Sequence, residues 1–232
     1  MALATYKDLC LDATDAALLG KFWGAALGLE VEPLDDGDVR LTGPTAQHTV
    51  WVNTVPEPVL VKQRVHLDIR ARDVEEVLAL GATPVDLEAF PWKVLRDPEG
   101  GELCVFERED APGSGDRLLE VVVDCADPAV LAAWWAELLG GVHRDDEQGR
   151  WSWVEQVPGA PFADLVFVPV PEPKTVKNRV HLDLTAPDVD AVVRHGAQVL
   201  RARDDEIGWT VLADPAGNEL CVFEDAPDPT RG

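Results

Sequence analysis

The chain has 232 residues, of which 43 are acidic and 20 basic, and its formal net charge is −23 at pH 7. A surface this negative repels phosphate backbones and anionic lipids, so we expect neither nucleic acid nor a membrane as partner. No apolar run approaches the roughly 20 residues that span a bilayer, and the N-terminus lacks a signal-peptide pattern. We therefore predict a cytoplasmic protein whose four cysteines, none in a CxxC pair, are reduced thiols.

The first predicted elements are a strand and an amphipathic helix in the segment LCLDATDAALLGKFWGAALG. An apolar stripe at helical spacing, which includes Trp23 and Leu27, predicts the buried face of the helix. Asp15 is placed to cap the first turn, and Gly28 is placed to end the helix.

The string VKQRVHLDI predicts the next well-defined strand, because apolar and polar residues alternate along it. Its apolar residues face the core, whereas His66 and Asp68 face away. A short helix follows, and then the strands WKVLRD and ELCVFE, in which Glu102 and Cys104 face away from the core. In the first strand of the chain, Asp8 takes the same outward face.

The same blocks return in the same order in the second half, as VVVDCADPAVLAAWWAELLG, VKNRVHLDL and DPAGNELCVFE. The shift between copies is 112 residues at Asp12 and 117 at Asp97, so the halves differ only by small loop insertions. The Pro/Gly/Ser-rich segment 111–116 is typical of a linker. We predict an α+β fold of tandem βαβββ modules at 1–110 and 117–232, with cupped mixed sheets and helices on their outer face.

The alternation of side chains gives each half a polar sheet face as well as an apolar one. In the second half, the outward residues are Glu120, His181, Asp183, Glu219 and Cys221. Two such faces opposite each other would form a cleft suited to a small ligand. Tryptophans on other strands, Trp92 and Trp209 among them, belong either to the core or to the walls of this cleft.

VPEPVLVKQRVHLDI and VPEPKTVKNRVHLDL, together with the two DPxG…ELCVF strings, resemble the vicinal oxygen chelate superfamily over essentially the whole chain. That superfamily includes glyoxalase I, bleomycin-resistance proteins, fosfomycin-resistance enzymes and extradiol dioxygenases. The resemblance is strongest to its glyoxalase-like branch. It implies the tandem βαβββ fold and a small-molecule cleft, but the superfamily contains both enzymes and binding proteins, so activity stays open.

Metal-using members of the superfamily place one ligand on the first strand of a module, a histidine on the RVHLD strand and a glutamate on the last strand. Carried over to this sequence, these positions fall on Asp8 or Glu120, on His66 or His181, and on Cys104 or Cys221. The sequence thus departs from the family pattern at two of the three positions. Carboxylate, imidazole and thiolate together can bind Zn²⁺ or Fe²⁺, and Mn²⁺ and Ni²⁺ are further candidates. Alternatively, each histidine bonds its neighbouring aspartate beneath a ligand cavity, and the cysteines only fill space.

Two functions follow as hypotheses. The first is small-molecule binding or sequestration without a tightly bound metal. The ligand-binding residues would be Asp8, His66, Asp68, Trp92, Cys104, Glu120, His181, Asp183, Trp209 and Cys221. The second is a metal-dependent lyase, isomerase or dioxygenase, with a metal held by Asp8, His66, Glu120 and His181 and with Glu102 or Glu219 carrying a proton. One half could also bind while the other is a structural copy, with a slight preference for the second half. A monomer can complete a cleft, and a homodimer is the alternative.

Overall fold

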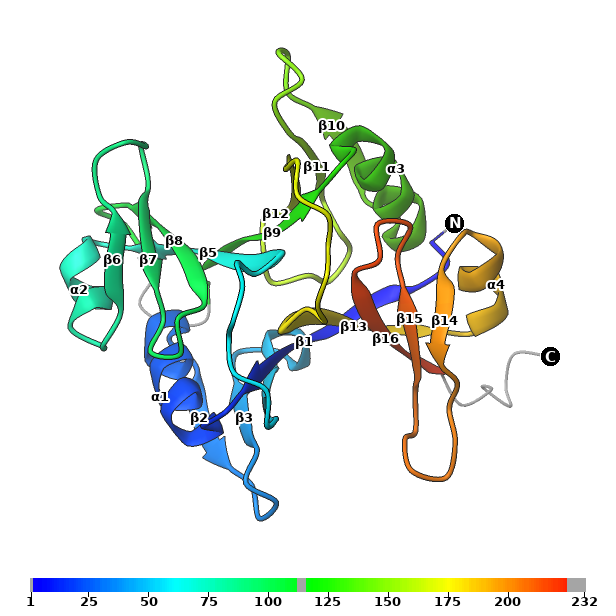
Figure 1. Ribbon diagram of the computed structural model, residues 1–232, viewed down its shortest axis with the longest axis horizontal. Coiled ribbons are helices and arrows are strands. Elements are labelled where there is room, and N and C mark those ends of the chain that lie inside the picture. The colour runs from blue at the N-terminus through cyan, green and yellow to red at the C-terminus, as the bar shows by residue number, and fades with distance from the viewer. Residues whose placement is uncertain (1, 112–115, 225–232) are drawn as a thin grey trace.

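The structure, a computed structural model, describes residues 2–111 and 116–224. These residues fold as four successive βαβββ units, two in each half of the chain (Figure 1). Unit 1 comprises β1 (Thr5–Ala13), α1 (Ala16–Leu27), β2 (Glu30–Pro33), β3 (Val39–Thr42) and β4 (Val50–Thr54), with a 3-10 turn (Ala46–His48) before β4. Unit 2 comprises β5 (Val65–Ala71), α2 (Val74–Leu78), β6 (Thr83–Asp86), β7 (Lys93–Arg96) and β8 (Glu102–Glu107).

The second half repeats this order. Unit 3 comprises β9 (Leu118–Cys125), α3 (Pro128–Leu139), β10 (Val142–Asp145), β11 (Ser152–Glu155) and β12 (Asp164–Pro169). Unit 4 comprises β13 (Val180–Ala186), α4 (Val189–Arg194), β14 (Gln198–Arg201), β15 (Thr210–Ala213) and β16 (Glu219–Glu224). Most of the predicted linker, residues 112–115, lies outside the described residues. None of the helices in the described part of the chain has the length and apolar character needed to cross a membrane.

The units pair across the two halves rather than within them. One eight-stranded sheet, sheet A, has the order β14-β15-β16-β13-β1-β4-β3-β2 and therefore joins unit 4 to unit 1. The other, sheet B, has the order β10-β11-β12-β9-β5-β8-β7-β6 and joins unit 3 to unit 2. Both junctions are antiparallel, β1 with β13 and β5 with β9. The predicted α+β fold of tandem modules is confirmed, with the addition that every sheet takes half its strands from each module.

Helices α1 and α3 form where the sequence predicted them, for the predicted reasons. The side chain of Asp15 accepts a hydrogen bond from the amide of Leu18, and Asp127 caps α3 in the same way. Such a cap typically stabilises a helix by about 1 kcal/mol. Gly28 and Gly140 end the two helices with positive φ angles of 71° and 74°, a conformation in which a Cβ atom would be strained.

The two helices cover the apolar faces of the sheets. Helix α1 packs on β2, β3 and β4, and α3 packs on β10, β11 and β12. The alternating residues Leu9 and Leu11 of β1 are at most 2 % exposed, as the strand pattern predicted. Burial of one such leucine contributes about 2 kcal/mol. Since the helices occupy the apolar faces, the opposite faces of both sheets are left to the polar residues.

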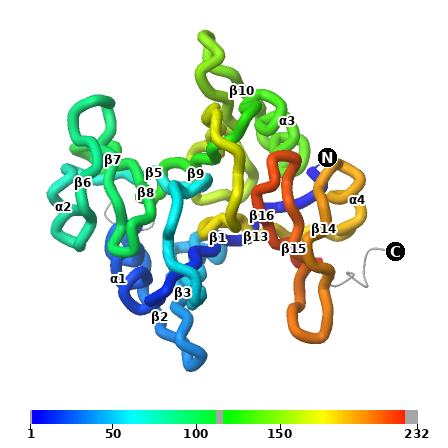
Figure 2. The backbone as a smooth tube through the Cα atoms, in the orientation of Figure 1, coloured from blue at the N-terminus to red at the C-terminus, as the bar shows by residue number. Residues whose placement is uncertain are grey.

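The repeated VPEP strings lie between β4 and β5 and between β12 and β13, where they hold the two halves together. Figure 2 shows the two segments, cyan and yellow, passing each other between the sheets. Arg64 Nη2 donates to the carbonyl oxygens of Glu172 (2.6 Å) and of the following proline (2.9 Å). In return, Arg179 Nη1 donates to the carbonyl oxygen of Glu57. Each repeated arginine therefore binds the VPEP string of the other half.

Candidate functional site

The polar faces of the two sheets contain the acids, histidines and cysteines that the sequence singled out. The polar face of sheet A, here called site A, contains Asp8, Cys10 and Asp12 from β1, His181 and Asp183 from β13, and Glu219 and Cys221 from β16. The polar face of sheet B, here called site B, contains His66 and Asp68 from β5, Glu102 and Cys104 from β8, and Glu120 and Asp124 from β9.

Each site combines the first-strand acid of one half with the histidine and cysteine of the other. In site A, Asp8 lies opposite Asp183, which in turn lies beside Cys221 on β16. In site B, Glu120 lies opposite Asp68 in the same arrangement. Each of the two polar faces therefore takes residues from both halves of the chain.

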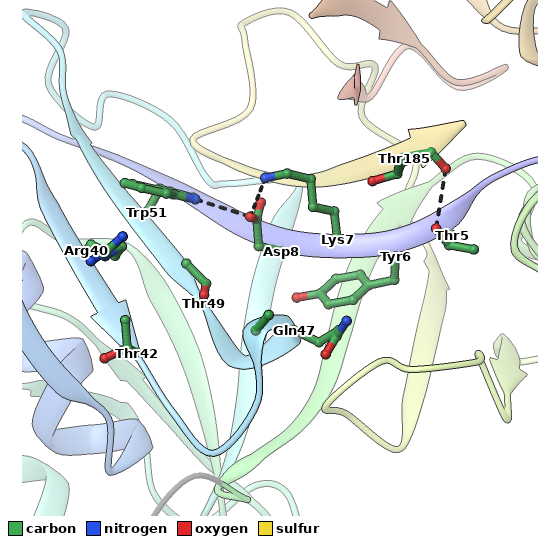
Figure 3. Close-up of a pocket in the computed structure, with 11 residues that line it drawn as sticks. Thr5, Tyr6, Lys7, Asp8, Arg40, Thr42, Gln47, Thr49, Trp51 and Thr185 are labelled. Atoms are coloured by element: carbon green, nitrogen blue, oxygen red, sulfur yellow. Dashed lines mark hydrogen bonds and ion pairs between the residues drawn. The ribbon is translucent and has the colours of Figure 1, made fainter. Parts of the chain in front are cut away.

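The carboxylate of Asp8 in site A is bound by two donors from its own half. Lys7 Nζ lies 2.6 Å from Asp8 Oδ2, and Trp51 Nε1 donates to the same oxygen at 3.2 Å (Figure 3). Lys7 can reach the polar face because the pairing of β1 with β13 shifts register between Tyr6 and Asp8, which is a β-bulge. The bulge gives site A an internal ammonium group.

The Asp183 carboxyl is the centre of two further polar contacts in site A. Cys10 Sγ donates to Asp183 Oδ2 at 3.5 Å, and His181 Nε2 lies 3.5 Å from Asp183 Oδ1. Burial and the nearby charge of Lys177 lower the pKa of His181 to about 4, so the imidazole is neutral at pH 7. Burial and Asp183 raise the pKa of the Cys10 and Cys221 thiols, which are therefore protonated.

Site B has a similar layout but a different charge balance. His66 Nε2 lies 3.2 Å from Asp68 Oδ1 and 3.7 Å from Cys104 Sγ. Burial favours the neutral imidazole, but the hydrogen bond and charge of Asp68 outweigh it and raise the pKa of His66. Burial, followed by the charges of Asp68 and Asp164, raises the pKa of Glu120 to about 7. Among the described residues, Glu120 has no lysine paired with it, whereas Asp8 of site A is paired with Lys7.

A lysine from each VPEP segment extends over the neighbouring site. Lys177 forms an ion pair with Asp12 in site A, and Lys62 forms one with Asp124 in site B. Both lysines are more than half exposed, while the two carboxylates are at most 7 % exposed. Because the aspartates sit on the first strands and the lysines belong to the other half, these pairs also connect the halves.

A pocket of about 390 Å³ opens beside Asp8 on the polar face of sheet A (Figure 3). Arg40 of β3 and Trp51 of β4 line it together with Asp8. The remaining lining residues are Thr5, Tyr6, Lys7, Thr42, Ala46, Gln47, Thr49 and Thr185. The lining combines a carboxylate, two cationic side chains, several hydroxyls and one indole ring, which suits a small polar ligand with a flat part.

The two tryptophans expected near the ligand lie at corresponding places in the two sheets. Trp92 stacks on Phe106 with ring centroids 5.5 Å apart, and Trp209 packs on Phe223 at 5.3 Å. All four rings are partly exposed, so they are wall residues of the polar faces rather than core residues.

The two glutamates expected to carry a proton differ in their surroundings. Glu219 accepts hydrogen bonds from Lys174 Nζ (2.7 Å) and from the Asn178 amide (3.0 Å), which hold it in place. Within the described residues, Glu102 has only longer contacts, to Arg96 at 3.8 Å and to Lys62 at 4.0 Å. Glu102 is therefore less constrained by neighbouring groups than Glu219 is.

The donor atoms of both sites fit a divalent metal ion, and the two groups of donors include the expected His66 and His181. Cys10, His181 and Asp183 form one group whose potential ligand atoms lie within 4.8 Å of one another, and His66, Asp68 and Cys104 form the other. Both histidines also keep a buried Nδ1 without a hydrogen-bond partner among the described residues. The predicted first-strand ligands Asp8 and Glu120 lie outside both groups. A mixed nitrogen, oxygen and sulfur set suits Zn²⁺ best, with loss of the thiol proton on binding.

Some residues of site A escaped the reasoning from sequence. Lys7 should face the core by strict strand alternation, and only the bulge moves it to the polar face. Arg40 alternates with the buried Val39 and Leu41, so its outward direction could have been found from that pattern. Cys10 had the right direction but no signal that set it apart from a small core residue.

Comparison with known proteins identifies the fold family. A family model described as a glyoxalase-like domain matches residues 8–106 and again residues 120–223. Glyoxalase I from Zea mays is 14 % identical and aligns over 95 % of this chain and 92 % of its own, with a TM-score of 0.63. A putative dioxygenase from Bacillus subtilis is 14 % identical over 97 % of this chain and 86 % of its own, with a TM-score of 0.65.

At these identities, the solved structures establish a shared fold but do not establish a shared activity. A search of curated proteins finds none that matches this chain. The family model, in contrast, covers most of the chain in two consecutive copies. The chain therefore belongs to the glyoxalase-like domain family of the vicinal oxygen chelate superfamily, with two copies of the domain.

Proposed function

We propose that this protein binds a small polar organic molecule in the pocket beside Asp8, and that this binding requires no metal ion. The observation that supports the proposal is the lining of that pocket. Asp8, Arg40 and Trp51 come from three adjacent strands and offer an anion, a cation and an aromatic ring to the same space. The pocket volume of about 390 Å³ lies in the usual range for small-molecule sites.

The groups in the pocket are held in place before any ligand binds. The indole N–H of Trp51 donates to Asp8, which fixes the plane of the ring. Arg40 Nε and Nη2 both donate to Glu32 Oε2, at 2.9 and 2.5 Å. Since their side chains are already ordered, binding costs little conformational entropy.

A metal-dependent enzyme is the second candidate, and the two donor groups of sites A and B favour it. A divalent ion there would act as a Lewis acid on vicinal oxygens of a substrate. His66 and Asp68 would hold such an ion in site B together with Cys104. Glu102, on the same strand as Cys104 and only loosely paired, would accept the substrate proton.

A thermal-shift and calorimetric screen of small polar compounds, run on protein treated with EDTA, tests the first proposal. We expect a ligand that raises the melting temperature and binds at least tenfold more weakly to Trp51→Ala and to Asp8→Asn. Trp151→Ala, which removes a partly exposed tryptophan directly before β11 and outside the pocket, is the matched control and should bind normally. Binding that requires added Zn²⁺, and that is lost in His181→Ala or His66→Ala, would overturn the proposal in favour of the metal enzyme.

A further inference from the structure

The threonines that line the pocket beside Asp8 distinguish site A from site B. The lining includes four of them, from β1, β3 and β13 and from the residue before β4: Thr5, Thr42, Thr185 and Thr49. Figure 3 shows the side chains of Thr42 and Thr49 below Trp51 and Asp8. Since both sheets are built from the same repeat, the strand registers give the counterpart of each threonine in site B.

Two of these threonines correspond to arginines. Thr5 and Thr185 are partners where β1 pairs with β13. At the corresponding place of sheet B, where β9 pairs with β5, the amide of Arg70 donates to the carbonyl oxygen of Arg117 at 2.8 Å. Thr185 and Arg70 each follow the histidine of their strand by four residues. Site A therefore has two hydroxyl side chains where site B has two guanidinium groups.

The other two threonines correspond to acids. In the pairing of the first strand of each unit with its fourth, Thr49 of site A and Asp164 of site B hold the same register position. On the next strand outward, Thr42 and Glu155 are counterparts in the same way. In site B, burial together with the charge of Glu155 raises the pKa of Asp164. The threonine positions of the pocket thus carry charge in the other copy, whereas site A has neutral hydroxyls there.

The three charged side chains of the pocket lining already have partners within the chain. Asp8 pairs with Lys7 Nζ at 2.6 Å and accepts from Trp51 Nε1 at 3.2 Å. Arg40 pairs with Glu32, and its guanidinium carbon lies 5.8 Å from the centroid of the Trp51 ring. A charged ligand would have to compete with one of these partners, and separating a paired charge is costly where burial limits hydration. The net charge of −23 also opposes the approach of an anion. An uncharged ligand meets neither cost.

A buried phenol hydroxyl in the lining lacks a partner. Tyr6 is 4 % exposed, and its hydroxyl makes no hydrogen bond to any other described residue. Figure 3 shows the ring beneath Asp8, with the hydroxyl directed toward Thr49. Burial raises the pKa of Tyr6 well above its ordinary value, so the group stays an O–H donor. A buried donor without an acceptor is costly, and an oxygen atom of a bound ligand removes that cost.

We propose that the pocket beside Asp8 takes an uncharged polyhydroxylated ring, which is the chemistry of a monosaccharide; this rests on the proposed function and names its ligand. Hydroxyl groups both donate and accept, so they can bond the threonine hydroxyls, the side-chain amide of Gln47 and the Tyr6 O–H. Arg40, whose hydrogen bonds within the described residues use Nε and Nη2, has Nη1 left to donate to a ligand oxygen. The volume of about 390 Å³ is at the lower end of the usual range, which limits the ligand to a small molecule.

Isothermal titration of the full chain, after EDTA treatment, with D-glucose, D-galactose and D-mannose tests this proposal. We expect saturable binding of at least one of these hexoses at one site per chain. The uronate and the 2-amino sugar of that hexose have the same ring with a charge. Each should bind about tenfold more weakly, because the charges of the pocket are already paired. Cyclohexanol, a six-membered ring with one hydroxyl, should not bind detectably.

Two substitutions in the lining distinguish a ligand contact from a structural role. Tyr6→Phe removes only the unpaired hydroxyl, so it should weaken hexose binding about fivefold without lowering the melting temperature of the free protein. Thr49→Asp gives the pocket the acid that site B has at this position, and should weaken binding about tenfold. Thr49→Ser keeps the hydroxyl and should bind as the unchanged protein does. Thr83→Asp, which adds the same charge at an exposed position of β6, is the control and should bind normally.

Other results would overturn the proposal. Absence of saturable hexose binding, equal binding of the uronate or the amino sugar, or full binding by either Tyr6→Phe or Thr49→Asp would each show that the ligand is of another class. Should Thr49→Asp fail to fold, as judged by circular dichroism, Tyr6→Phe and the charged analogues decide the question. If no hexose binds but the wider screen finds a ligand that Trp51→Ala loses, the proposed function stands and only this ligand class fails. If no compound binds, the proposed function fails as well.

Discussion

Asp8 and Asp183 lie opposite each other in the antiparallel pairing of β1 with β13, although they belong to different halves of the chain, and both are buried. Neighbouring negative charges repel strongly where water is excluded. Burial, together with the charge of Asp8, therefore raises the pKa of Asp183 above its ordinary value of 3.8. The folded protein consequently binds a proton at Asp183 more tightly than the unfolded chain does.

This raised pKa predicts a pH dependence of stability. A carboxyl group whose pKa rises on folding destabilises the protein as the pH increases from 3.8 through the folded pKa, because the folded state must then ionise it. We expect Asp183→Asn to increase the free energy of unfolding by about 1–2 kcal/mol at pH 8 and to change it little near pH 4. Urea unfolding at several pH values measures this, with the exposed Asp205→Asn as control. An identical pH slope in both variants would contradict the assignment.

Glu99 lies in the turn between β7 and β8, and we expect its substitution to lower the stability of the protein strongly. Its carboxylate accepts from the amides of Thr14 and Asp15 (2.9 and 2.7 Å) and pairs with Arg179 Nη2 at 3.1 Å. Both charged side chains are buried, at 8 % and 11 % exposure. Glu99→Ala should lower the free energy of unfolding by about 3 kcal/mol, because it leaves the Arg179 guanidinium without its carboxylate partner.

The control for this substitution comes from the same chain. Glu109→Ala removes an exposed glutamate and should change stability by less than about 0.5 kcal/mol. The equivalent turn of the second half has Ala216 where the first has Glu99, so the turn itself does not need the carboxylate. A loss for Glu99→Ala no larger than that for Glu109→Ala would show that the network contributes little.

Substitution of either lysine that extends over a site should change the pKa of the histidine in that site and not the pKa of the other histidine. Lys177 lowers the pKa of His181, and Lys62 lowers that of His66, because each ammonium disfavours a second positive charge nearby. Lys177→Gln should therefore raise the pKa of His181 from about 4 and leave His66 unchanged, and Lys62→Gln should do the converse. Proton NMR titration of the imidazole resonances measures both. Equal shifts of the two histidines would mean that the lysines act through a general change in fold.

We expect the four cysteine thiols to react slowly in the folded protein and quickly in the unfolded chain. All four are buried, and burial raises the pKa of each thiol, to about 12 in the case of Cys125. Since the thiolate is the reactive form, Ellman's reagent at pH 8 should label none of them quickly in the native protein. All four should react within minutes in guanidinium chloride. Rapid labelling of native Cys104 or Cys221 would show that the polar faces hold a low-pKa thiol.

Strand alternation, helix caps and the internal repeat could be read directly from the sequence, because each depends on residues that are close along the chain. Asp15 and Gly28 marked the ends of α1, and the alternation in RVHLD placed His66 and Asp68 on the polar face of β5. The same reading in the second half placed His181 correctly. These features follow from local backbone geometry and from the burial of every second side chain.

Only the tertiary structure decided which copies meet. Because the two halves carry nearly the same strings, the sequence alone does not distinguish pairing of β1 with β5 from pairing with β13, and long-range packing of the whole chain selects the latter. Asp8 therefore faces Asp183, and Glu120 faces Asp68. A one-residue bulge, invisible in the residue pattern, then moves Lys7 onto the polar face and makes the two sites chemically different.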